Sequence, residues 1–218
     1  MANSVTLKAG KRERLVESAT ALFHEQGVHR TTLAEVAERA EVPLGNVYYY
    51  FKTKDELVGA VLAGYMEQAA TLIESFERGR TPQSRLKALV RNWSDMRDAV
   101  VSHGCPMGTL CAELDKIEGG LDREAAKVMA RIIDWSEDQF RQLGRQDARD
   151  LAVALFAGIQ GAALLANTFR DPSLLTRQTR HLERWIDSLS AGAGRRSRQP
   201  ASPRTRPGAE SRGVSSEG

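Results

Sequence analysis

The chain has 218 residues, of which 41% are hydrophobic and 27% charged, a composition typical of a folded globular protein. Its two cysteines are too few for a disulfide framework, and its N-terminus lacks the apolar stretch of a signal peptide. The longest nearly apolar run, residues 151–166, is shorter than the roughly 20 residues that cross a bilayer. These features exclude a disulfide scaffold, disfavour a membrane span and predict a cytoplasmic location.

Charge is distributed unevenly along the chain. Residues 1–54 carry eight basic and six acidic side chains, residues 55–192 carry 17 and 20, and residues 193–218 carry six and two. Basic ends around a slightly acidic middle favour a polyanionic partner at one end. A solvated surface with a basic tail would give the same distribution, so charge alone does not decide the function.

Apolar residues recur with helical spacing from Lys11 to Ser190, and no segment reads convincingly as a strand. The first helix is expected to close at Gly27, and three prolines stand where they open helices rather than break them. The pattern predicts an all-α fold of about nine helices. Their approximate ranges are residues 11–26, 33–40, 44–50, 54–78, 82–100, 106–116, 121–143, 151–169 and 172–189.

The segment 32–51 predicts two short amphipathic helices joined by a tight turn. Thr32 and Glu35 have the spacing of a capping box at the first of them. This is the plan of a helix-turn-helix, whose second helix lies in the major groove of DNA. Val47 and Phe51 are expected to face inward. The residues expected to face outward are Leu44, Gly45, Asn46, Tyr48 and Tyr49.

The chemistry of this outward face suits DNA. Tyrosine hydroxyls reach phosphates, asparagine bonds base edges or backbone, and glycine lets the helix approach closely. Lys52 and Lys54 follow directly and supply counter-charges for phosphates. Thr53 is expected to cap the next helix. Tyr50 is expected to pack against the first helix rather than to read bases.

Residues 11–62 resemble the DNA-binding head of the TetR family of bacterial transcriptional repressors. The matching features are Ala21-Leu22-Phe23 with Gly27, Thr31-Thr32, Ala37 with Ala40, and the run from Gly45 to Leu57. The resemblance implies phosphate contacts from Thr31, Thr32 and Lys54. It places in the groove the residues Gly45, Asn46, Tyr48 and Tyr49. Leu44 departs from the polar or basic residue common in relatives, so its contact is expected to be apolar or absent.

The chain is expected to have three parts. Residues 1–54 form a helix-turn-helix domain, residues 55–191 an effector-binding and dimerisation domain, and residues 192–218 a disordered tail. The helices after residue 54 agree in number and length with the C-terminal domain of the family. The tail is rich in Arg, Ser, Pro and Gly, which cannot bury enough surface to offset the entropy of ordering.

The resemblance implies a homodimer that binds a palindromic operator. The apolar segment 151–169, paired with the last helix, resembles the antiparallel four-helix dimer interface of the family. Small residues permit close approach and large ones supply apolar area. The expected interface residues are Leu151, Leu155, Gly158, Gly161, Ala162, Leu165, Phe169 and Trp185. A helix buried inside one chain is the alternative.

The family binds small-molecule effectors between its middle helices. Apolar side chains there could line a cavity of the kind that small ligands occupy, although core packing is the better explanation for each of them. Gln160 stands out because an amide inside an apolar helix must find a partner. The candidate pocket residues are Trp93, Met96, Cys105, Met129, Ile133, Phe140, Phe156 and Gln160.

The two cysteines lie in HGCPMGTLCAELD, which resembles a stretch in a TetR subgroup that responds to electrophiles or oxidants. Cys105 follows His103 and directly precedes a helix start, a position that can make a thiol reactive. Alternatively, Cys105 and Cys111 are small buried hydrophobes, or they pair, although their spacing puts them on different faces. Zinc binding lacks a fourth ligand, and no metal or cofactor is expected.

The resemblance implies a repressor that a small molecule, or modification of Cys105, releases from its operator. A DNA-binding regulator without a ligand, anchored by its basic tail, is the alternative. An enzyme is disfavoured. The pairs His103–Cys105 and His24–Glu25 match no nucleophile or metal motif, and no phosphate-binding glycine loop is present.

Overall fold

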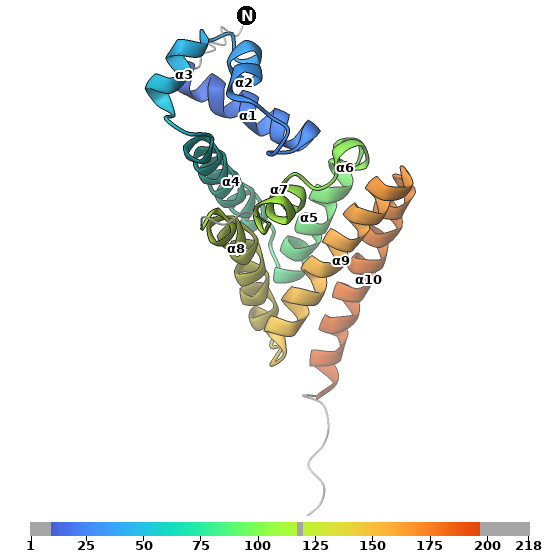
Figure 1. Cartoon of the computed structure of the whole chain (residues 1–218). Coiled ribbons are helices and arrows are strands. Elements are labelled where there is room, and N and C mark those ends of the chain that lie inside the picture. Colours follow the sequence, from blue (N-terminus) through green and yellow to red (C-terminus); the bar gives the residue numbers. More distant parts are fainter. Residues whose placement is uncertain (1–9, 117–119, 197–218) are drawn as a thin grey trace, which may run out of the picture.

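A computed structural model describes residues 10–116 and 120–196 of the chain, and every regular element in these ranges is an α-helix (Figure 1). The all-α prediction is confirmed. In chain order the helices are α1 (Lys11–Gln26), α2 (Leu33–Arg39), α3 (Leu44–Tyr50), α4 (Lys54–Glu77), α5 (Pro82–Asp95), α6 (Arg97–His103), α7 (Pro106–Leu114), α8 (Leu121–Gln142), α9 (Ala148–Phe169) and α10 (Ser173–Arg196).

Two boundaries differ from the expectation. The segment from Pro82 is divided at Met96, which closes α5 and also caps α6, so the described ranges hold ten helices rather than about nine. The last helix continues to Arg196, so residues 192–196 are helical instead of belonging to a disordered tail. The remainder of the expected tail, 197–218, lies outside the described residues.

The first core lies where α1, α2 and α3 meet the N-terminal half of α4 (Figure 1). Leu15, Val36, Val47 and Leu57 are completely buried there, and each such burial contributes roughly 1.5–3 kcal/mol. Because residues of α4 complete this core, the head does not end at residue 54. We call α1–α3 with the start of α4 the head.

The second core is formed by α5, α8, α9 and α10 with the C-terminal half of α4. The 22-residue helix α9 is long and apolar enough, by length and composition alone, to cross a membrane. Eight of its residues, including Leu155 and Ile159, are buried against the helices around it. This burial explains the apolar residues on the side of α9 that faces this core. We call this helical body, with α6 and α7, the effector domain, after the role that the sequence leads us to expect for it.

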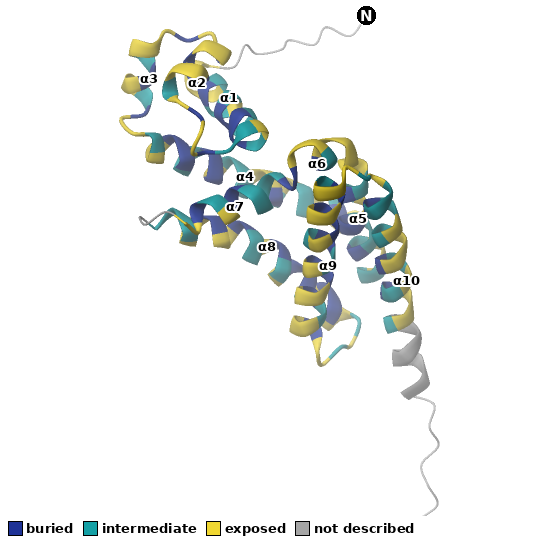
Figure 2. Cartoon of the chain, turned by 45° about the vertical axis from the view of Figure 1, so that its right-hand side comes forward, coloured by how far each residue is buried: buried dark blue, intermediate teal, exposed yellow. Residues whose placement is uncertain are grey.

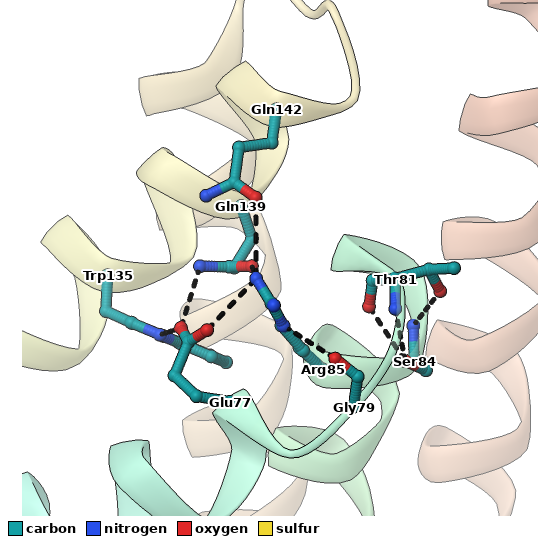
Figure 3. A network of polar contacts seen from close by, with 8 residues as sticks. All are labelled: Glu77, Gly79, Thr81, Ser84, Arg85, Trp135, Gln139 and Gln142. Atoms are coloured by element: carbon teal, nitrogen blue, oxygen red, sulfur yellow. Dashed lines mark hydrogen bonds and ion pairs between the residues drawn. The ribbon is translucent and has the colours of Figure 1, made fainter.

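A polar network fixes the C-terminal end of α4 to α5 and α8 (Figure 3). Glu77 accepts hydrogen bonds from Trp135 Nε1 at 2.7 Å and Gln139 Nε2 at 3.3 Å, and its second oxygen lies 3.0 Å from Arg85. Arg85 also donates to the Gly79 carbonyl at 2.9 Å and to Gln139 Oε1 at 3.3 Å. The helix α4, about 36 Å long at 1.5 Å per residue, carries the head at its other end. The network therefore anchors the arm that positions the head.

Candidate nucleic-acid interface

The turn between α2 and α3 is closed by local backbone contacts. Glu41 adopts φ 54°, in the left-handed region, which lets the chain reverse direction after α2. Val42 N donates to the Ala37 carbonyl at 2.9 Å and completes the end of the helix. The side chain of Val42 is buried in the head core, and Pro43 precedes the first turn of α3. The turn thus sets α3 against the head with one face inward.

One face of α3 is buried and the other is open to solvent. Val47 and Phe51 are buried as the sequence predicts. Tyr48 and Tyr49 are 50% and 77% exposed, and Leu44 on the same surface is also exposed. Gly45 is exposed and Asn46 is half-buried; a Cβ added at Gly45 would meet nothing within 4 Å. An exposed face of large aromatic side chains on a short helix is unusual for a surface without a partner.

The structure corrects the expectation for Thr31. Its side chain is only 1% exposed, its hydroxyl donates to the Gly27 carbonyl at 2.8 Å, and it lies 3.3 Å from the donor Gln26 Nε2. A hydroxyl with two internal partners holds the loop between α1 and α2 instead of facing DNA. Thr32 is exposed, and its hydroxyl accepts from Glu35 N at 3.2 Å in the predicted capping box.

The two lysines after α3 differ in their surroundings. Lys52 is exposed, and its Nζ donates to the Tyr48 carbonyl at 2.7 Å, at the C-terminal end of α3. Lys54 is half-buried at the start of α4, and its Nζ donates to the His29 carbonyl at 3.4 Å. Burial lowers the pKa of Lys54 from its ordinary value.

A surface ion pair joins α1 to α2. The Arg39 guanidinium donates from two nitrogens to the two carboxylate oxygens of Glu25, one of them at 2.7 Å. The hydrogen bond from Arg39 lowers the pKa of Glu25. Because both side chains are about 40% exposed, the pair contributes at most about 1 kcal/mol. It fixes the geometry of the head more than its stability.

The two cysteines lie on different faces of α7 and in different cores. Cys105 caps the helix, its Sγ accepting from Gly108 N at 3.4 Å, and is buried in the effector domain. Cys111 is buried in the head core, and this burial raises its pKa to about 11. Both are free thiols. The exposed His103 ring contacts His24 of α1 edge-on, at 5.4 Å between centroids.

The structure describes no metal site and one unpaired amide. In the described ranges, no group of three or more His, Cys, Asp or Glu side chains could hold a metal ion. Gln160 reaches the first turn of α7, where a Cβ on Gly108 would lie 2.7 Å from its Oε1. Gln160 Nε2 is buried without a hydrogen-bond partner among the described residues. Burial raises the pKa of the neighbouring Tyr65 hydroxyl to about 12, and Cys105 adds to the shift.

The expected pocket residues do not form one group. Phe140 is completely buried, and its ring contacts Trp185 at 5.9 Å, so it is a core residue. Met96 is exposed, because it lies where the chain breaks between α5 and α6. Trp93 and Phe156 meet edge-to-face at 6.2 Å between α5 and α9. The two half-buried residues of α8 in the expected set are Met129 and Ile133.

The expected dimer residues divide between two faces of α9. Leu155 and Ala162 are buried in the core of their own chain. A Cβ on Gly158 would lie 3.4 Å from Leu182, so this glycine packs against α10. Leu155 and Ala162 are therefore not available to a second chain, which corrects the expectation for these two residues, whereas Gly158 is half-buried. Leu151 and Trp185 are half-buried on the same core.

The outer face of α9 is exposed to solvent (Figure 2), and large apolar side chains lie on it. Leu165 and Phe169 of the expected set lie on it, and Gly161 is exposed with open space around it. Sequence reasoning missed Val153 and Leu164, which are also exposed. Positions 153, 157, 161, 164 and 168 follow helical spacing, but the buried positions 155, 159, 162 and 166 do so as well, so spacing alone does not identify the exposed face. We call the exposed side of α9 the α9 outer face.

Comparison with known proteins agrees with this architecture. Residues 15–61 match the family model described as bacterial regulatory proteins, tetR family, which covers the head. Residues 82–182 match the model described as tetracyclin repressor-like, C-terminal domain, which begins at α5 and ends within α10. The second match includes α7, whose Leu110, Cys111 and Leu114 are nevertheless buried in the head core.

The chain is 30% identical over 188 residues to the uncharacterized HTH-type transcriptional regulator Rv0196 of Mycobacterium tuberculosis, covering 79% of this chain and 94% of that one. It is 29% identical over 99 residues to the HTH-type transcriptional repressor KstR2 of Rhodococcus jostii, covering 45% and 48%. A TetR transcriptional regulator from Legionella pneumophila has the same fold, with a TM-score of 0.75 at 17% identity over 84% of this chain and 98% of that one. The chain therefore belongs to the TetR family and is a helix-turn-helix transcriptional regulator.

Proposed function

We propose that this regulator is a repressor that binds a palindromic operator as a homodimer and leaves it when a small molecule binds or Cys105 is modified. The observation that carries the proposal is the exposed face of α3, with Tyr48 and Tyr49 in solvent. Repression requires only that the operator be occupied, and the relative from Rhodococcus jostii is named a repressor. Such a protein would act in the cytoplasm, where the DNA is.

The exposed chemistry of the head supports contacts of three kinds with DNA. Tyr48 and Tyr49 offer hydroxyls and rings to phosphates and base edges, and Leu44 offers an apolar contact to a thymine methyl. Gly45 leaves room for the sugar–phosphate backbone. The side chains proposed to hold phosphates are Thr32, Lys52 and Lys54. Asn46, half-buried, completes the proposed groove contacts, and Thr31 supports them from inside the loop.

The α9 outer face supports a dimer. Leu164 and Phe169 are 66% and 67% exposed, and Val153 and Leu165 extend the apolar surface along the helix. Exposed large apolar side chains on a soluble chain favour burial against a partner. An isologous contact between two copies of α9 would place two heads at a fixed distance, which a palindromic operator requires. The small exposed residue Gly161 would let the two helices approach closely.

The unpaired amide of Gln160 supports a small-molecule effector with a carbonyl or other acceptor group. A buried donor without a partner carries a free-energy cost of about 1–3 kcal/mol, which a ligand acceptor would remove. Apolar side chains of α5, α8 and α9 surround the interior of this domain. Those proposed to meet the ligand are Trp93, Met129, Ile133 and Phe156.

The position of Cys105 supports release by an electrophile. An α,β-unsaturated carbonyl would form a carbon–sulfur bond at its β-carbon as its C=C π bond breaks, and the thiol proton would end on the α-carbon. Cys105 is buried and caps α7, so the added group would displace this helix. Leu110 and Leu114 of the same helix are buried in the head core. A displaced α7 would therefore move the head.

The test begins with selection of bound duplexes from a random DNA pool by the full chain. We expect a palindromic consensus and a complex of two chains per duplex. An asymmetric consensus bound by one chain would contradict the homodimer. Release of the selected duplex is then measured with 1,4-benzoquinone on wild type, Cys105→Ser and the matched control Cys111→Ser. We expect release from wild type and Cys111→Ser only; equal release from all three would exclude Cys105 as the modified residue.

A further inference from the structure

A carboxylate of the effector domain reaches into the head. Glu113, on α7, accepts a hydrogen bond from the backbone N–H of His29 at 3.3 Å, across 84 positions of sequence. A Cβ on Gly27 would lie 2.5 Å from one carboxylate oxygen and 3.0 Å from the other. Gly27 also has φ 88°, which favours glycine. The carboxylate therefore packs directly against the bare backbone of the loop between α1 and α2.

The peptide that Glu113 holds also meets Lys54. His29 presents its N–H to the carboxylate and its carbonyl to Lys54 Nζ, at 3.4 Å. Burial lowers the pKa of Lys54, and the carboxylates of Asp55, Glu113 and Glu35 oppose this shift. The His29 backbone is thus hydrogen-bonded on one side to Glu113 of the effector domain and on the other to Lys54 of the head.

The rest of α7 fixes where Glu113 stands. Leu110, Cys111 and Leu114 of this helix are buried in the head core, so the helix cannot slide along the head without unpacking them. The loop on the other side is held by Thr31, whose hydroxyl donates to the Gly27 carbonyl at 2.8 Å. Glu113 thus provides a polar contact from the effector domain to a loop that Thr31 and Lys54 hold from within the head.

We infer that Glu113 is a positioning residue for DNA binding. Its carboxylate fixes the His29 peptide, and through this peptide it fixes Lys54 and the loop that ends at Thr32 where they meet the DNA backbone. The inference rests on the phosphate contacts proposed above for Thr32 and Lys54. Glu113 is then also the residue that would transmit a movement of α7, starting at its Cys105 end, to the phosphate contacts of Thr32 and Lys54.

Two variants of equal charge isolate this contact. Glu113→Gln and Glu113→Ala both remove one negative charge, so their long-range attraction to DNA is the same. Only the glutamine retains an oxygen that can accept from His29 N. We expect Glu113→Gln to bind the selected operator within about threefold of wild type and Glu113→Ala about tenfold more weakly, the effect of losing one hydrogen bond to a charged group. The matched control Asp115→Asn loses the same charge on an exposed residue of the same segment and should bind like wild type.

A second measurement needs no DNA. Hydrogen exchange of the His29 amide should be about tenfold faster in Glu113→Ala than in Glu113→Gln, because the acceptor is lost. Equal operator affinity of the two variants, or equal exchange of the amide, would overturn the inference. Lys54→Ala distinguishes the proposed phosphate contact of Lys54 from the proposed role of Glu113. Wild-type operator affinity in Lys54→Ala would refute the phosphate contact. The exchange rates of the His29 amide in the Glu113 variants test the role of Glu113 alone.

Discussion

The network around Glu77 anchors the far end of α4, and we expect Glu77→Ala to destabilise the whole chain. Glu77 lies near the surface, but its partners do not: Trp135 and Gln139 are 9% and 2% exposed (Figure 3). Truncation removes the acceptor of the 2.7 Å bond from Trp135 Nε1 and of the 3.3 Å bond from Gln139 Nε2.

The magnitude follows from these lost acceptors. A buried donor left unsatisfied costs about 1–3 kcal/mol, and the shorter bond to Trp135 accounts for most of the effect. Arg85 keeps its bonds to Gly79 and Gln139, so the lost ion pair adds at most about 1 kcal/mol. We expect a loss of roughly 3 kcal/mol in the free energy of unfolding, and a fall in Tm of about 6–12 °C for a chain of this size.

The assay is denaturant unfolding followed by circular dichroism, with Glu74→Ala as the control. Glu74 is an exposed carboxylate three positions earlier on α4, and its loss should change stability by less than about 0.5 kcal/mol. Glu77→Gln should fall between the two, because its amide oxygen still accepts from Trp135 while its amide nitrogen opposes Arg85. Equal stability of Glu77→Ala and Glu74→Ala would refute the reasoning.

Other single changes test other contacts. Lys54→Ala should reduce the slope of log affinity against log salt by about 1 for every duplex, and titrations at several salt concentrations measure it; an unchanged slope argues against a phosphate contact. Thr53→Ala, which removes the cap of α4, should lower the free energy of unfolding by about 1 kcal/mol in denaturant melts. The pKa of Cys111 is raised in the fold from 9.0 to about 11, so its stabilisation is present below pH 9 and lost as pH rises toward 11. Cys111→Ala should therefore be less sensitive than wild type to unfolding in that range, and identical pH profiles would be inconsistent with a buried thiol. Leu164→Glu with Phe169→Glu should yield a monomer by size-exclusion chromatography; a persistent dimer would place the interface elsewhere.

The head could be predicted closely because its signals are local. The capping box of Thr32 and Glu35 and the cap at Thr53 mark helix starts within four residues of sequence. Apolar spacing on α3 then separates Val47 from Tyr48 and Tyr49 without any knowledge of the neighbouring helices. Each of these features depends on short-range geometry, and the structure agrees with each.

The faces of α9 could not be assigned in the same way. This helix is apolar nearly all round, so hydrophobicity does not say which side meets its own chain. Leu155 looked equivalent to Leu165 in sequence, yet the first is completely buried and the second is exposed. The difference arises from the packing of α8 and α10 on one side of α9, which only the fold supplies.

Individual side-chain hydrogen bonds could not be predicted from the sequence either. A threonine such as Thr31 can contact a phosphate, but here its hydroxyl donates a hydrogen bond to the Gly27 carbonyl instead. Glu113 lies on a short helix, and its partner His29 is 84 positions away in the sequence. No local pattern marks such a pair, because the contact exists only once α7 has packed on the head.

The central claim is that the exposed face of α3 reads the operator, and the affinity of Tyr48→Ala for DNA tests it most directly. Equilibrium dissociation constants are measured for the selected operator and for a scrambled duplex of equal length, with Tyr50→Phe, a change at a half-buried position of the same helix, as the control. The account predicts that Tyr48→Ala loses about 10- to 100-fold in affinity for the operator, as expected for a base-reading contact, and binds the scrambled duplex like wild type. Undiminished operator affinity in folded Tyr48→Ala would contradict the account.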